Sequence, residues 1–214
     1  MRLIVEDLSA KRGDDLIFQD ISFVLDASEA LVVTGANGSG KSTLLRVLAG
    51  LLAAETGTVR IEGFDAEIER AGEVSHYLGH RNAMKRELTV GENLTFWKRY
   101  LGDSPHGTGM DIDEATDAVG LGDLVQIPFG YLSAGQQRRM AMAKLLVSYR
   151  PVWILDEPTA ALDTGADQLF AGLVTRHRAN GGIVIAATHQ PLGFEQAKVL
   201  DMKSFAAVLQ EEWA

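Results

Sequence analysis

A glycine-rich run at residues 35–43 restricts the fold of this chain more than any other part of its 214-residue sequence: Gly35, Ala36, Asn37, Gly38, Ser39, Gly40, Lys41, Ser42 and Thr43. The run has the spacing of a phosphate-binding loop, in which glycines let successive backbone N–H groups turn toward an anion. The apolar run at 31–33 does not alternate, which predicts a central strand buried on both faces. Apolar residues after the loop recur at helical spacing. The sequence therefore predicts a strand, an anion-binding loop and a helix.

The ligand expected at this loop is a nucleoside triphosphate. Lys41 would add positive charge at the outer phosphates, and Ser42 would offer its hydroxyl to Mg²⁺. A glycine-rich turn with a solvated lysine is the alternative interpretation. The strand before the loop and the helix after it disfavour that alternative.

Two later apolar runs, at 152–155 and 183–187, repeat the buried-strand pattern and end on polar residues. In an open parallel sheet, ligands bind beyond the carboxyl ends of the strands, so these polar residues should converge on one crevice. Asp156 is the expected Mg²⁺ ligand there, and Glu157 the expected base for the attacking water. The same acidic pair could instead cap a following helix. His189, after the second run, would face the same crevice.

The segment at 132–136, Leu-Ser-Ala-Gly-Gln, precedes another apolar-periodic stretch. Taken alone, Ser133 is typical of a helix N-cap. The surrounding region, roughly residues 81–150, is predicted to be mostly helical and to form a lobe of its own.

In this order along nearly the whole chain, the segments resemble the ATP-binding subunits of ABC transporters. The resemblance identifies residues 35–43 as Walker A, 132–136 as the signature, 152–157 as Walker B, 161–163 as the D-loop and His189 as the switch histidine. It implies an α/β fold with a phosphate-loop NTPase core on a parallel sheet, an N-terminal antiparallel β subdomain and a helical signature subdomain at about 81–150. All of these would belong to one domain spanning 1–214.

The resemblance also implies ATP and Mg²⁺ as cofactors and an ATP-dependent, head-to-tail homodimer. The signature of one subunit would cover the ATP held by the Walker A loop of the other, because a second helix N-terminus can complete the cage around the γ-phosphate. The nucleotide-binding set then also includes Ser133, Gly135, Gln136 and Asp163. The implied catalytic set is Lys41, Glu157 and His189, with His189 aligning the attacking water.

Two positions depart from the general family pattern. Arg12 stands where an aromatic residue usually contacts adenine, and it could stack on the base or remain a solvated charge in a turn. His80 stands where a glutamine usually contacts Mg²⁺, and its imidazole could bind metal or water, or only line the subunit interface. Arg12 is thus a candidate for nucleotide binding, and His80 for the metal.

These departures, together with the segments at 77–80 and 92–97, resemble the ATPase subunits of the cytochrome c maturation system, a haem-exporter subfamily. That resemblance implies integral membrane partners, the B, C and D subunits, and a peripheral location on the cytoplasmic face of a bacterial inner membrane. ATP turnover would release a haem-loaded chaperone. The alternatives are the ATPase of another small-substrate ABC transporter and, less favoured, a soluble non-transport ABC ATPase.

Composition agrees with these expectations. The 20 Lys and Arg against 29 Asp and Glu give a net charge of −9, which disfavours nucleic acid as a partner. The absence of cysteine excludes disulfides and thiolate metal sites and fits the cytosol. No apolar run approaches the roughly 20 residues of a membrane span, and no export signal is predicted.

Several other residues carry no predicted chemistry. Three histidines are expected at the surface: His76, His106 and His177. The aromatic residues Phe96, Trp97 and Tyr100 are predicted mostly to pack along a helix, although an edge shared with a membrane partner remains open. The tail at 196–214 fits either strand or helix.

Overall fold

The structure is a computed structural model that describes residues 1–64, 71–102, 107–159, 162, 164–188 and 196–205. Its strands form two sheets. The smaller sheet has the order β2-β1-β4 and is antiparallel throughout, with β1 at Arg2–Arg12, β2 at Asp15–Asp26 and β4 at Thr56–Glu62. This sheet is the predicted antiparallel β subdomain.

The larger sheet has the order β5-β6-β7-β3-β8, and all of its neighbouring strands run parallel. Its strands are β3 (Ala30–Thr34), β5 (Ser75–Leu78), β6 (Val152–Asp156), β7 (Ile183–Ala187) and β8 (Lys198–Asp201). Every residue of β6 and β7 is buried, as their unbroken apolar sequences predict. Because the strands are parallel, their carboxyl ends lie along one edge.

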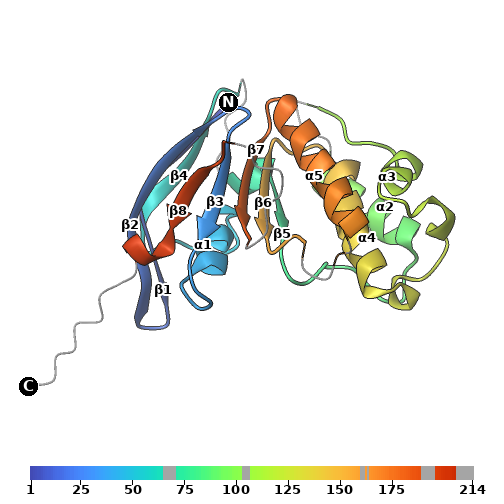
Figure 1. The fold of residues 1–214 in the computed structure, drawn as a ribbon, viewed down its shortest axis with the longest axis horizontal. Helices are drawn as coiled ribbons and strands as arrows, with labels where there is room; N and C mark the ends of the chain where they lie inside the picture. The colour runs from blue at the N-terminus through green and yellow to red at the C-terminus, as the bar shows by residue number, and fades with distance from the viewer. Residues whose placement is uncertain (65–70, 103–106, 160–161, 163, 189–195, 206–214) are drawn as a thin grey trace, which may run out of the picture.

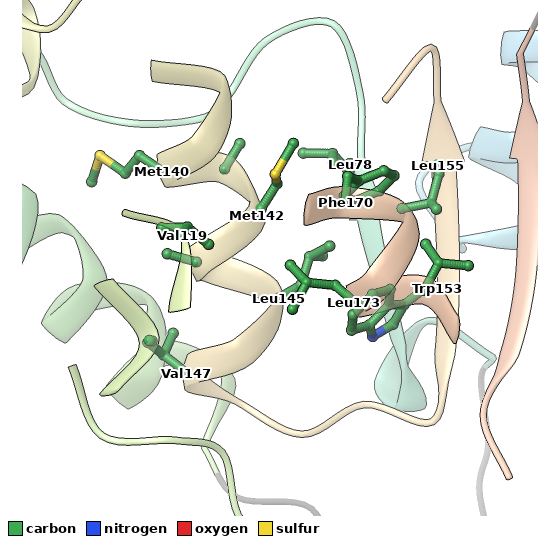
Figure 2. Packing of buried hydrophobic residues seen from close by; sticks show 14 of the residues in the cluster. Leu78, Val119, Met140, Met142, Leu145, Val147, Trp153, Leu155, Phe170 and Leu173 are labelled. Atoms are coloured by element: carbon green, nitrogen blue, oxygen red, sulfur yellow. The ribbon is translucent and has the colours of Figure 1, made fainter. Parts of the chain in front are cut away.

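Two apolar clusters cover the two faces of this sheet. On one face, α1 (Lys41–Leu48) packs with residues of the parallel sheet and of the antiparallel sheet. On the other face lie α4 (Ala134–Val147) and α5 (Thr164–Ala179) (Figure 1). Figure 2 shows Leu145 and Leu173 of these helices beside Trp153 and Leu155 of β6. Alternate residues of one strand therefore belong to different cores.

The region between β5 and β6 is mostly helical, as predicted. It contains α2 (Val90–Leu101) and α3 (Ile112–Ala118), both packed against α4, and two short 3₁₀ turns at Gly122–Leu124 and Phe129–Tyr131. Further 3₁₀ turns lie at Ala71–Val74 and Met202–Phe205. The part of the tail that the structure describes contains β8 and the last of these turns, which settles what the sequence left open for residues 198–205.

The prediction of surface histidines is wrong for two of the three. His76 is 2% exposed and its Nε2 lies 2.7 Å from the carbonyl oxygen of Ser148, while His177 stacks on Trp153 with ring centroids 4.0 Å apart. Burial lowers the pKa of His76 to about 3 and that of His177 to about 4, so both imidazoles are neutral in the fold near neutral pH. His106 lies outside the described residues.

The aromatic residues of α2 divide into two groups. Trp97 packs as expected, since its Nε1 donates to the carbonyl oxygen of Ala83 at 3.0 Å and the Lys144 ammonium lies 4.7 Å from its ring centroid. Phe96 and Tyr100, in contrast, are 48% and 71% exposed. Phe96 still stacks on Tyr100 along α2, with ring centroids 5.8 Å apart, and both rings contact Trp97. The prediction of packing along the helix is therefore confirmed, and Phe96 and Tyr100 in addition present exposed faces.

Candidate functional site

The phosphate loop has the backbone geometry that its glycines predict. Gly35, Gly38 and Gly40 have φ angles of 140°, 84° and 95°, in the region that side chains disfavour. A Cβ atom on Gly35 would lie 2.6 Å from Ser39 Oγ, and one on Gly40 would lie 2.6 Å from Cγ2 of Ile17. Any other residue at these two positions would have to displace its neighbours.

The start of α1 leaves donors available for an anion. Its N-cap, Gly40, provides no side-chain hydrogen bond, and the first-turn N–H groups of a helix have no partner within it. Lys41 is 9% exposed, and its Nζ donates to the carbonyl oxygens of Gly35 at 2.7 Å and Ala36 at 3.0 Å. Ser39 Oγ is buried without a hydrogen-bond partner among the described residues. Open donors, an orphaned hydroxyl and an ammonium together fit a polyphosphate.

Two oxygen donors meet where the loop approaches β6. Ser42 Oγ donates to Asp156 Oδ1 at 3.1 Å, and Asp156 is 1% exposed. The Tyr77 hydroxyl donates to the other carboxylate oxygen at 3.2 Å, and burial, the largest influence, raises the pKa of Tyr77. Hydroxyl and carboxylate oxygens are the ligands that Mg²⁺ prefers, so this pair fits the predicted metal site.

His80 is exposed and follows the end of β5 by two residues. In the part of the chain that the structure describes, no three His, Asp or Glu side chains form a cluster that could hold a metal ion. The structure brings Ser42 and Asp156 together by a direct hydrogen bond. A metal role for His80 stays a prediction.

Glu157 follows Asp156 at the carboxyl end of β6 and has an unusual backbone. Its φ angle is 47°, and its N–H donates to the carbonyl oxygen of Ala187 at 2.9 Å. The neighbouring strand end therefore holds this residue beside the Ser42–Asp156 pair. His189, two residues beyond the end of β7, and Asp163 lie outside the described residues.

The signature segment contains the N-cap residue of α4, Ser133. Ser133 Oγ accepts from the N–H of Gln136 at 3.2 Å, while Gln136 Oε1 accepts from the N–H of Ser133 at 2.9 Å. Ser133 is exposed to solvent, and Gly135 is half-buried. Because α4 and α1 cover opposite faces of the parallel sheet, the start of α4 is not part of the layer that holds the loop helix.

Arg12 lies at the exposed end of β1, where it pairs with Asp15 across a hairpin. The following residues of this hairpin reach the phosphate loop, because a Cβ atom on Gly40 would touch Ile17 and lie 3.6 Å from Phe18. The hairpin that carries Arg12 thus packs against the loop. Whether Arg12 contacts a base stays a prediction.

Arg138 was not singled out by sequence reasoning, yet it touches the site from α4. It is 5% exposed and donates to the carbonyl oxygens of Glu157 at 2.6 Å and Pro158 at 2.7 Å. One signal was available: Arg138 shares a helical stripe with Met142 and Leu145, where a core residue is expected. A charge at such a position needs buried partners.

Comparison with known proteins agrees with this geometry. The family described as "ABC transporter" matches residues 18–160. The "Cytochrome c biogenesis ATP-binding export protein CcmA" of Rhizobium meliloti (strain 1021) is 70% identical over 205 residues, covering 96% of this chain and 99% of that protein. The protein of the same name from Agrobacterium fabrum (strain C58 / ATCC 33970) is 64% identical, and the match covers 100% of both chains. The chain belongs to the ABC transporter family, in the CcmA group.

A solved structure supports the fold assignment of this CcmA-group chain. The "Putative ABC transporter (ATP-binding protein)" from Pyrococcus furiosus has a TM-score of 0.77 at 19% identity, covering 97% of this chain and 100% of that one. As a member of the ABC family, the chain is an ATP-binding protein and an ATP hydrolase. None of the described helices is both long and apolar enough to cross a membrane.

Proposed function

We propose that this chain is the Mg²⁺-dependent ATPase subunit of a membrane ABC complex for cytochrome c biogenesis and haem export, and that its ATP turnover releases a haem-loaded chaperone. The observation that carries the proposal is the 70% identity to a CcmA protein over 96% of the chain. The geometry of the loop and of the Ser42–Asp156 pair supports the ATPase part of it.

The residues of the chain divide the chemistry among them. The loop N–H groups and Lys41 compensate the charge of the phosphates. Ser42 and Asp156 hold Mg²⁺, which would neutralise further charge on the phosphate oxygens when bound. Glu157 accepts a proton from the attacking water, and His189 aligns that water.

A second copy of the chain completes each site in this proposal. Ser133, Gly135 and Gln136 of one subunit face the ATP on the loop of the other, with Asp163 near the same interface. The exposed start of α4 supports this arrangement, because its donors are accessible to a partner. The Ser133 hydroxyl accepts one hydrogen bond within its own chain and still has its O–H to donate to a phosphate.

Membrane subunits corresponding to B, C and D are the proposed partners, and they place the chain peripherally at the cytoplasmic face of a bacterial inner membrane. A groove of about 990 Å³ beside α2 supports a protein contact there. Phe96 and Tyr100 line it with exposed, stacked rings 5.8 Å apart. Exposed aromatic residues are common at the centre of protein interfaces.

The test is to purify the tagged chain from bacterial membranes in detergent and identify what accompanies it. We expect integral membrane proteins encoded for cytochrome c biogenesis and no enrichment of RNA. ATPase activity of the preparation should need Mg²⁺ and disappear with a chelator. Recovery of a different transporter's membrane subunits would contradict the biogenesis role, and recovery of ribosomal RNA would contradict a role in transport altogether.

A further inference from the structure

Arg138 lies in the second turn of α4, the helix that begins at the signature residue Ser133. Its side chain is buried at a position where the helix otherwise presents apolar residues to the core. Burial lowers the pKa of Arg138, and the carboxylates of Asp156 and Glu157 oppose that effect. Since a guanidinium stays protonated at any ordinary pH, the fold holds a buried cation here.

The guanidinium bonds two segments that come from different strands. Toward the end of β6, Nη2 donates to the carbonyl oxygen of Glu157 at 2.6 Å, and Nε donates to that of Pro158 at 2.7 Å. Toward the end of β5, Nη1 donates to the carbonyl oxygen of Gly79 at 2.8 Å and to Asn82 Oδ1 at 3.3 Å. Arg138 thus links the residues after both strands to one helix.

The bond to Glu157 matters because the backbone there is strained. A left-handed conformation is unfavourable for a residue other than glycine, so it persists only where neighbours enforce it. The N–H of Glu157 is held by Ala187 and its carbonyl oxygen by Arg138, on either side of the Cα atom. These two bonds orient the peptide planes from which the carboxylate projects.

We propose that Arg138 is a positioning residue for ATP hydrolysis: it fixes the backbone of Glu157 and the segment that flanks His80, and it ties both to α4. The inference rests on the proposed function, in which Glu157 activates the attacking water. Arg138 acts through Glu157 and does not itself touch the nucleotide. Loss of Arg138 should therefore impair turnover more than ATP binding.

Lysine cannot perform this task equally well. The planar guanidinium sends N–H groups in fixed, diverging directions, so that one side chain reaches carbonyl oxygens on both segments. A lysine ammonium keeps the charge, but it is a single point at the end of a flexible chain. The change Arg138→Lys therefore removes the geometry while keeping the cation.

The neighbouring Arg139 offers a matched control. It lies on the same helix, and its Nη1 donates to the carbonyl oxygens of Val119 at 3.3 Å and Gly120 at 3.2 Å, at the end of α3. These contacts are of the same kind as those of Arg138, but they involve neither Walker B nor the segment that flanks His80. Arg139→Lys should leave the rate of hydrolysis within about twofold of that of the wild type.

The experiment measures kcat, the KM for ATP and the Kd for ATP of the full chain in the Arg138→Lys and Arg138→Ala variants. For Arg138→Lys we expect kcat to fall about tenfold while KM and Kd change less than about threefold. If the Arg138→Ala variant folds, its kcat should fall at least as much. If it does not fold, the kcat of Arg138→Lys alone tests the inference. A normal kcat in Arg138→Lys, or a loss explained by weaker ATP binding, would overturn the inference.

Glu157→Gln, measured in parallel, separates this inference from the proposed function. If Glu157→Gln hydrolyses ATP normally, the role proposed for Glu157 fails, and the role of Arg138 fails with it. If Glu157→Gln is inactive while Arg138→Lys is normal, only the role of Arg138 fails. An inactive Glu157→Gln together with a slow, tight-binding Arg138→Lys supports both.

Discussion

Helices α1 and α4 begin in opposite ways, although both starts are predicted to face a phosphate. The N-cap of α1 is Gly40, which has a left-handed backbone and makes no side-chain hydrogen bond. The N-cap of α4 is Ser133, which forms a complete capping box with Gln136. Capping boxes also begin α2 at Thr89 and α3 at Asp111, so α4 begins as these two helices do and α1 does not.

The difference shows what each helix start can do without a ligand. A capping box satisfies backbone donors that would otherwise need water or another partner, and it stabilises the helix by about 1 kcal/mol. Two donors at the start of α4, the N–H groups of Ser133 and Gln136, are therefore satisfied within the single chain. The start of α1 has no capping box, so its first-turn N–H groups receive no side-chain hydrogen bond from the N-cap. Lys41 at this position donates to carbonyl oxygens of the loop itself. The stability of α1 should depend on ATP, whereas that of α4 should not.

The strongest test concerns how the two helix starts meet in a dimer. We expect Glu157→Gln to lower turnover about a thousandfold, because the amide keeps the size of the carboxylate but cannot accept a proton from water. ATP binding should be preserved, so the variant should accumulate as an ATP-bound dimer in size-exclusion chromatography. A variant that stays monomeric with ATP at high protein concentration would contradict a site shared between α1 and α4.

A second change removes the positive charge of Lys41, the first residue of α1. Lys41→Ala should weaken ATP binding about a hundredfold, since the outer phosphates lose their charge-assisted partner in the loop. Isothermal titration calorimetry with Mg-ATP measures this directly. Lys11→Ala, which removes an exposed lysine paired with Glu55, should bind ATP as the wild type does. Wild-type affinity in Lys41→Ala would refute the assignment of the phosphate loop.

The start of α4 can be tested against an equivalent cap that has no predicted contact with ATP. Ser133→Ala should lower stability by about 1 kcal/mol and turnover about twentyfold, because both the cap and the contact with the partner's phosphate are lost. Thr89→Ala removes the same kind of cap from α2. It should lower the stability of the chain by a similar amount and leave the rate of ATP hydrolysis unchanged. Thermal unfolding and ATPase assays of both variants give the comparison. Equal turnover in the two would assign Ser133 a capping role only.

The smallest expected effect belongs to His80, where this chain departs from the general family pattern. His80→Ala should lower turnover about tenfold, or roughly 1.4 kcal/mol, with ATP binding changed less. His80→Gln should keep most activity, since the amide retains a donor and an acceptor. If His80 only lines the subunit interface, the isolated His80→Ala chain is normal and loses activation by membrane subunits. Wild-type behaviour in both settings would refute any role.

Much of the fold and of the ATP site could be predicted from the sequence because the signals are local. The glycine spacing at 35–43 specifies a backbone path, and the unbroken apolar runs at 152–155 and 183–187 specify strands buried on both faces. Parallel strands align their carboxyl ends, which brings Asp156 to the loop, where Ser42 bonds it. These conclusions need only the chain near each motif and the geometry of a parallel sheet.

The tertiary structure alone decided which polar groups share a buried space. Arg138 bonds partners 20 and 59 residues away along the chain, and His76 bonds one 72 residues away. No local pattern encodes such pairs, because burial of a polar side chain is tolerated only where distant segments supply its hydrogen bonds. The sequence therefore determined the glycine loop and the strand end that carries Asp156, while only the packing of α4 against the strand ends decided what holds the backbone of Glu157.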